Sequence, residues 1–115
     1  MVKLHVRRVE GHVVRFALHG HAECGEYGYD LVCAATSALT IAAANGLFEH
    51  AGVSRAVRYR SGYLDCVILN CPSAEVRMRA DAVLETMISG IRAIALEYPE
   101  SVSVVDIGGS VSARY

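Results

Sequence analysis

The sequence predicts a two-layer α+β domain in which two helices pack on a mostly antiparallel sheet of about five strands. Short stretches alternate apolar and polar residues, as strands with one buried face do. Two longer stretches have the length and composition of helices. These elements follow one another in the order ββαββαβ, and 115 residues suit a single domain spanning positions 1–115.

The first two strands are expected to form a β-hairpin. Apolar residues alternate with polar ones over positions 2–6 and again over 14–18, with Glu10 and Gly11 between the two runs. The next segment, residues 19–29, holds three glycines and shows no apolar period. We therefore expect it to be a loop with freedom to move.

Asp30 is the expected N-cap of the first helix, because an aspartate at that position accepts hydrogen bonds from unpaired first-turn amides. The helix is expected to run from Leu31 to about His50. Small residues lie on almost every face of it, which predicts close packing on more than one side. This helix is expected to be either central in the fold or part of a dimer contact.

The second half of the chain is expected to form two more strands, a second helix and a final strand. Strands are expected over 56–60 and 64–70 on either side of Ser61-Gly62. From Ala74 onward, apolar residues recur at three- and four-residue steps, which predicts an amphipathic helix that stops before Pro99. A final strand is expected over 102–107.

The charge, the apolar segments and the cysteines of the chain indicate which classes of partner and which cell compartment to expect. Eleven basic and twelve acidic residues give a net charge of -1, so we expect no direct nucleic-acid partner. The first residues do not resemble a signal peptide, and polar residues interrupt the longest apolar segment, so no membrane contact is expected. The four cysteines contain no CxxC pair and are expected to be free thiols in a cytoplasmic protein.

Cys33 and His21 are the candidate catalytic residues. If Asp30 caps the helix, Cys33 occupies the third helical position, where free amides and the helix dipole stabilise a thiolate. His21 lies across the glycine-containing segment and has the near-neutral pKa that a general base needs. From the residues alone, Cys33 could equally be a small buried hydrophobe.

Two polar residues could support such a pair. Ser37 lies one turn after Cys33 on the same helix face, although its hydroxyl could simply bond to a helical carbonyl. Asp30 could orient the imidazole in addition to capping the helix. A zinc site is the alternative, since two imidazoles and two thiols could bind the metal tetrahedrally. Its ligands would be His19, His21, Cys24 and Cys33.

The segment HGHAECGEYGYDLVCAATSAL, residues 19–39, resembles the signature of the ribosomal-processing cysteine protease family, Prp. That signature joins a Gly-His-Ala element to a Val-Cys-Ala-Ala helix start through a loop containing Gly-x-x-Gly. The resemblance implies that His21 and Cys33 are catalytic, and Asp30 and Ser37 match further polar positions of the family. Cys24 has no counterpart in that pattern.

The resemblance also implies the partners. It predicts a cofactor-independent homodimer that cuts the N-terminal extension of large-subunit ribosomal protein 27 next to paired aromatic residues. The segment between His21 and Asp30 is then expected to fold over the bound peptide. The substrate loop would include Gly25, Tyr27, Gly28 and Tyr29. A noncatalytic ribosome-associated binding module, gripping the same ribosomal protein without cutting it, is the competing function.

Overall fold

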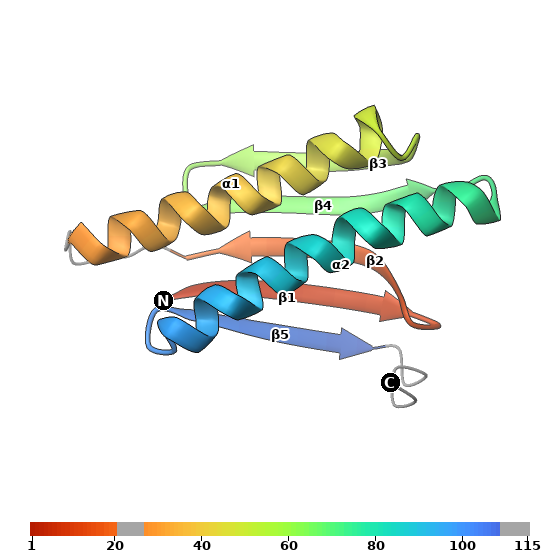
Figure 1. Cartoon of the computed structure of the whole chain (residues 1–115). Helices are drawn as coiled ribbons and strands as arrows, with labels where there is room; N and C mark the ends of the chain where they lie inside the picture. Colours follow the sequence, from red (N-terminus) through yellow and green to blue (C-terminus); the bar gives the residue numbers. More distant parts are fainter. Residues whose placement is uncertain (21–26, 109–115) are drawn as a thin grey trace.

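A computed structural model describes residues 1–20 and 27–108, with only the backbone described over 27–30. A five-stranded sheet forms one layer and two helices form the other (Figure 1). The predicted fold and the order ββαββαβ are confirmed. The strands are β1 (Val2–Val9), β2 (His12–His19), β3 (Ser54–Arg60), β4 (Tyr63–Asn70) and β5 (Val102–Gly108), and the helices are α1 (Tyr27–Glu49) and α2 (Ala74–Glu97).

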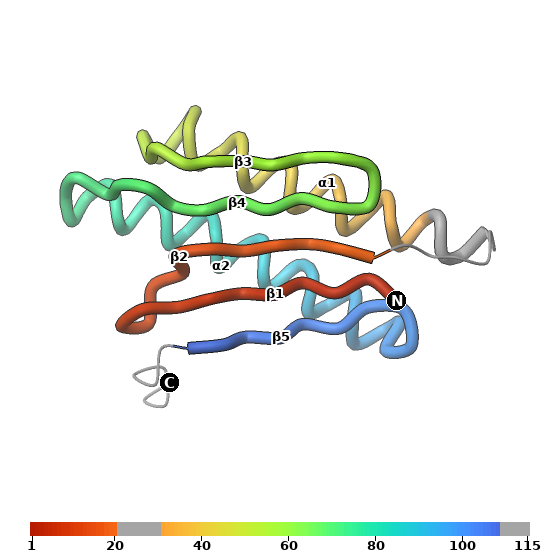
Figure 2. The backbone as a smooth tube through the Cα atoms, turned by 180° about the vertical axis from the view of Figure 1, so that it is seen from behind, coloured from red at the N-terminus to blue at the C-terminus, as the bar shows by residue number. Residues whose placement is uncertain are grey.

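The sheet is mixed, with the strand order β3-β4-β2-β1-β5. Neighbouring strands are antiparallel except for β1 and β5, which run parallel. Both helices cover the same face, with α1 over the β3–β4 half and α2 over the β1–β5 half (Figure 1). The opposite face carries no described helix (Figure 2).

The first hairpin turns through Glu10 and Gly11, as predicted. Both residues have positive φ, 52° and 81°, and they join the paired residues Val9 and His12. Two positive φ angles give a turn whose twist matches that of the flanking strands, which favours the two-residue connection. This hairpin fixes the register of β1 and β2, and so decides which of their side chains face the helices.

The core lies between the sheet and the helices. Alternate strand residues meet a stripe of α2 residues at three- and four-residue spacing, the pattern of an amphipathic helix. Burying one such large side chain contributes about 1.5–3 kcal/mol. The largest fully buried apolar side chains are Phe16, Leu4, Leu47, Leu84, Ile91, Val6, Val53 and Val102.

Helix α2 matches its prediction at both ends. The Ser73 hydroxyl accepts a hydrogen bond from the Val76 amide at 3.1 Å, which makes Ser73 the N-cap. The helix ends at Glu97, and the Tyr98 amide donates to the Ile94 carbonyl at 2.8 Å. Pro99 then prevents the helix from continuing.

The predicted start of α1 is wrong. The helix begins at Tyr27 rather than Leu31, so Asp30 lies inside its first turn and is not the N-cap. Tyr27, Gly28 and Tyr29, predicted as loop, are helical as well. A glycine inside a helix costs only about 1 kcal/mol, and an aspartate suits the first turn because of the helix dipole. Neither residue therefore forces the helix to begin after it.

The outward side of α1 is unusually apolar. The stretch Leu31–Glu49 has a mean hydropathy of 1.7 and is long and apolar enough to cross a membrane by length and composition. In this fold α1 packs on the sheet, and 33% of the stretch is buried, so much of its apolar surface faces outward. Leu31 and Phe48 are exposed there, together with several alanines.

Candidate active site

Cys33 lies in the second turn of α1, six residues after the helix start. It is a free, half-buried cysteine and packs against the hydrophobic core. Ser37 follows one turn later on the same helix face and is also half-buried. The predicted pairing of these two residues on one face is therefore present, although Cys33 lies further into the helix than expected.

Two buried threonines bond back to carbonyls of α1 in this region. The Thr36 hydroxyl donates to the Val32 carbonyl at 2.9 Å, and the Thr40 hydroxyl donates to the Thr36 carbonyl at 3.0 Å. Both side chains are fully buried, so these bonds satisfy hydroxyls that water cannot reach. Sequence reasoning treated the threonines only as polar interruptions, although their four-residue spacing indicates one helix face.

Gly20 fixes the end of β2. Its φ of 114° is unfavourable for other residues, and a Cβ at this position would overlap the Met1 carbonyl oxygen. The Gly20 amide donates to the Gly62 carbonyl at 3.2 Å, which ties the end of β2 to the β3–β4 turn. His21 directly follows this anchored residue and itself lies outside the described residues.

A small hollow connects that corner of the sheet with α1. Ser37 and Thr40 line it from the helix, while Gly62 and Tyr63 line it from the β3–β4 hairpin. Because Gly62 also binds Gly20, the fold brings the end of β2 to the helix face that carries Ser37 and Cys33. Gly20, the last described residue before the gap, therefore lies at this corner.

The predicted substrate loop and the alternative zinc site each include residues that the structure describes and residues that it does not. Gly25 and Cys24 lie outside the described residues. His19 stacks on His5 with ring centroids 4.8 Å apart, on the sheet face opposite the helices. Cys33 packs on the helix side of the sheet. The structure therefore does not bring His19 and Cys33 together as two ligands of one metal ion.

Cys66 differs chemically from Cys33. It is fully buried in β4, and burial raises the pKa of its thiol to about 11. At neutral pH the Cys66 thiol is therefore protonated and inaccessible, which excludes it as a nucleophile. Cys71, at the exit of β4, is free and half-buried, like Cys33.

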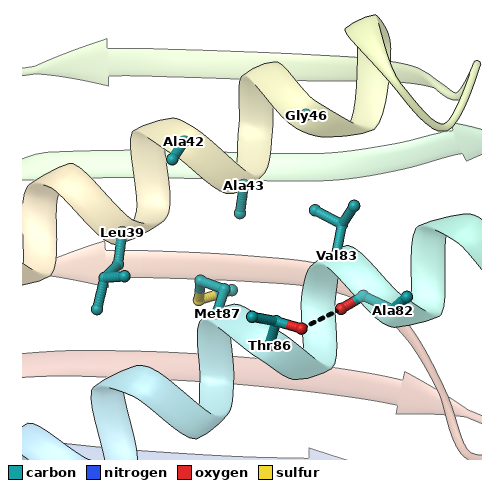
Figure 3. Close-up of a pocket in the computed structure, with 8 residues that line it drawn as sticks. All are labelled: Leu39, Ala42, Ala43, Gly46, Ala82, Val83, Thr86 and Met87. Carbon is teal, nitrogen blue, oxygen red and sulfur yellow. Dashed lines mark hydrogen bonds between the residues drawn. The ribbon is translucent and has the colours of Figure 1, made fainter.

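A cleft lies between α1 and α2, and Figure 3 shows residues that line it. Its volume is about 430 Å³ and its lining is mostly apolar. The Thr86 hydroxyl in its wall donates to the Ala82 carbonyl at 2.6 Å, so that polar group is satisfied within α2. Neither Cys33 nor Ser37, the predicted site residues whose side chains the structure describes, lines it; the described lining residues are Leu39, Ala42, Ala43, Gly46, Ala82, Val83, Thr86 and Met87.

A second groove runs between α1 and the edge strand β3. It has a volume of about 310 Å³, with Ile41 and Ala44 on one wall and Val57 and Tyr59 on the other. Ile41 and Tyr59 also line the hollow at Ser37, so the groove is continuous with the corner of the candidate site. Val57 and Tyr59 are exposed, which leaves apolar surface available for a bound molecule.

Known proteins resemble the chain in sequence and fold. The profile of the family described as Cysteine protease Prp matches residues 1–103. The ribosomal processing cysteine protease Prp of Bacillus subtilis is 28% identical over 107 residues, covering 90% of this chain and 96% of the relative. The protein of the same name from Staphylococcus aureus is 28% identical over 95 residues, covering 81% of this chain and 86% of the relative.

A crystal structure shows the same fold. It is the essential ribosomal processing protease Prp from S. aureus in complex with a covalently linked product peptide. The TM-score is 0.78 at 26% identity, covering 93% of this chain and 100% of that chain. The present chain is a cysteine endopeptidase of two-layer α+β fold. It belongs to the cysteine protease Prp family, which confirms the resemblance of residues 19–39.

Proposed function

We propose that the enzyme removes the N-terminal extension of large-subunit ribosomal protein 27, with Cys33 as nucleophile and His21 as general base. The observation that carries the assignment of residues is the Gly20–Gly62 hydrogen bond, which directs the end of β2 towards the helix face of Cys33 and Ser37. The names of the relatives, ribosomal processing cysteine proteases, support the substrate.

The chemistry has two halves, acylation and deacylation, and in each His21 takes up one proton and gives it back. His21 takes the proton from the Cys33 thiol, and the thiolate attacks the carbonyl carbon of the scissile bond. The tetrahedral intermediate collapses when His21 returns the proton to the departing amine, which leaves an acyl group on Cys33. A water molecule, deprotonated by His21, then attacks the thioester and releases the carboxylic acid and the free thiol.

The position at which α1 begins decides which backbone amides are free to stabilise the oxyanion. In a regular helix that begins at Tyr27, amides from Leu31 onward donate to carbonyls one turn earlier. The free amides belong to residues 27–30, a full turn away from the Cys33 side chain. We propose that substrate binding rearranges this turn, aided by Gly25 and Gly28, so that amides near Cys33 become available to the oxyanion.

The groove between α1 and β3 is our candidate for substrate binding. Among the strands that the structure describes, β3 pairs only with β4, so one row of its backbone groups is available to an extended peptide. The exposed ring of Tyr59 and the apolar groove floor suit the aromatic residues expected beside the cleavage site. The continuity of this groove with the Ser37 hollow leads the peptide towards Cys33.

A cleavage assay tests the catalytic residues. A peptide carrying the extension and its Phe-Phe junction is incubated with the full chain and analysed by mass spectrometry. Cys33→Ala and His21→Ala are expected to lower kcat/KM on the order of a thousandfold. Cys71→Ala and His50→Ala are the controls and should keep the wild-type rate. Undiminished turnover in Cys33→Ala ends this mechanism, and an intact peptide with wild-type enzyme favours the binding module.

The groove has its own test. Tyr59→Ala is expected to raise KM for the Phe-Phe peptide more than it lowers kcat, because it removes binding surface away from the reacting atoms. Tyr98→Ala, at the end of α2, removes an exposed tyrosine elsewhere and serves as the control. Equal effects of the two variants would show that the peptide does not use the groove.

We also propose that the enzyme is a cytoplasmic homodimer that associates through the outward face of α1. Exposed apolar patches on soluble proteins commonly mark contact surfaces, and the exposed alanines of α1 allow close approach of a second copy. Light scattering is expected to give twice the chain mass. Ala38→Glu should shift the enzyme to monomer, whereas Ala93→Glu, on an exposed face of α2, should not.

A further inference from the structure

The sheet face opposite the helices has a chemistry that the protease reaction does not use. We call it the open sheet face (Figure 2). In β1 its residues Lys3, His5 and Arg7 alternate with buried ones. Cross-strand pairing places the corresponding residues of the other strands beside them. Its polar and aromatic residues are Lys3, His5, Arg7, Arg15, His19, Arg58, Arg60, Tyr63 and Asp65.

Positive charge dominates this face. Of the 11 lysines and arginines in the chain, five are exposed here, namely Lys3, Arg7, Arg15, Arg58 and Arg60. Among the described strand residues, Asp65 is the acidic residue on the same face, and it is buried beneath Arg15, which donates to it at 2.7 and 2.8 Å. The face therefore retains a clear positive excess after this pair is counted.

The rest of the molecule carries the balancing charge. α2 and the turn after it lie on the other side of the molecule and hold five acidic residues against three arginines: Glu75, Asp81, Glu85, Glu97 and Glu100 against Arg77, Arg79 and Arg92. The net charge of -1 therefore does not reveal the positive excess of the open sheet face. A near-neutral chain can still present a local cationic surface to a nucleic acid.

Flat rings lie among the cations. The rings of His5 and His19 are stacked, with 9° between their planes, and line a groove of about 320 Å³ together with Arg7, Arg15 and Tyr63. Burial and the neighbouring His19 and Lys3 lower the pKa of His5, so its ring is neutral at pH 7. The Arg60 guanidinium lies 4.7 Å from the centre of the Tyr63 ring. Ring faces and cations therefore occupy one continuous surface.

We propose that the open sheet face binds single-stranded RNA, with its arginines and Lys3 on phosphates and the His5–His19 pair and Tyr63 stacking on bases. Sheets that combine exposed rings with flanking cations bind single strands in this way, because every base has a face on which to stack. An acidic peptide would match the cations but would leave the rings without planar partners. The proposal is independent of the protease mechanism, because this face lies across the sheet from Cys33.

Fluorescence anisotropy with a labelled single-stranded uridine oligonucleotide tests the proposal on the full chain. Wild-type protein is expected to bind with an affinity that falls steeply as salt rises. Arg7→Glu and Lys3→Glu should each weaken binding at least tenfold and leave cleavage of the Phe-Phe peptide unchanged. His5→Ala should weaken binding while keeping the salt dependence, since it removes a ring and no charge.

The controls decide between RNA and a general attraction to anions. Arg79→Glu makes the same charge change on α2 and should reduce binding less than threefold. A polyglutamate peptide of equal length should compete poorly. The proposal is overturned if wild-type protein does not bind at low salt, if Arg79→Glu loses as much affinity as Arg7→Glu, or if polyglutamate competes as well as RNA.

Discussion

Gly20 donates its amide hydrogen to the Gly62 carbonyl oxygen at 3.2 Å. This single bond links the end of β2 to the β3–β4 turn, and the same turn lines the hollow beside Ser37. Gly20 and Gly62 are far apart in the sequence, yet they meet at one corner of the molecule. Gly20 is also the last described residue before His21, the proposed base.

Gly20→Ala is expected to lower the free energy of unfolding by about 2–4 kcal/mol, because it combines an unfavourable φ with overlap against the Met1 carbonyl. Gly52→Ala is the matched control. Its φ is also positive, 74°, but nothing lies within 4 Å of an added Cβ, so a loss of about 1 kcal/mol is expected. Urea unfolding measures both, and equal losses would contradict a steric role for Gly20.

Leu84→Ala should cost about 2–5 kcal/mol of stability, because Leu84 is 1% exposed and its removal leaves a cavity under α2. Leu96→Ala, on the same helix, changes a side chain that is 85% exposed and should cost less than about 0.5 kcal/mol. Thermal or urea unfolding separates the two. Similar losses in the two variants would contradict the structure, in which the face of α2 that carries Leu84 packs against the sheet.

The Arg15 guanidinium lowers the pKa of the Asp65 carboxyl below its ordinary value of 3.8. The ionised pair therefore adds stability that is present above that value and is lost as the pH falls through the lower, folded-state pKa. Asp65→Asn should lower the free energy of unfolding by about 1–2 kcal/mol at pH 7. The gap to wild type should narrow below pH 3.8, and a gap that stays constant into acid would contradict this coupling.

Alkylation should distinguish the cysteines. In the folded protein at pH 7, Cys66 is expected to resist iodoacetamide, because it is buried and its thiol pKa is raised to about 11. Cys33 should react first, since an activated thiolate is the proposed nucleophile. Peptide mapping by mass spectrometry follows each site, with urea-unfolded protein as the reference. Labelling of Cys66 at the unfolded rate is the contrary result.

Local patterns were sufficient to predict most of the fold. The alternation of apolar and polar residues predicted β1 and β2. Ser61-Gly62 indicated the second hairpin, and Pro99 indicated the end of α2. The start of α1 was missed, because a local rule gave Asp30 the role of cap, whereas the helix continues back to Tyr27. The parallel pairing of β1 with β5 is a long-range contact, so no local pattern could indicate it.

Less of the candidate site than of the fold could be predicted from the sequence. The spacing of Cys33 and Ser37 placed both on one helix face, and the structure agrees. The contributions of Gly62 and Tyr63 depend on the β3–β4 hairpin folding back beside α1, which only the tertiary structure reveals. Likewise, the net charge could not show that five of the lysines and arginines gather on the open sheet face. The catalytic roles of His21 and Cys33 remain predictions for the assays above.

The pairing of β1 with β5 affects how the chain folds during synthesis. Val2 pairs with Val102, so β1 is made first but receives its second neighbour only when the last strand is available. The antiparallel part of the sheet and α1 need only residues up to Asn70. A nascent chain therefore carries an open β1 edge until the residues beyond Val102 leave the ribosomal exit tunnel. During that interval, strands of neighbouring nascent chains compete with β5 for the same edge.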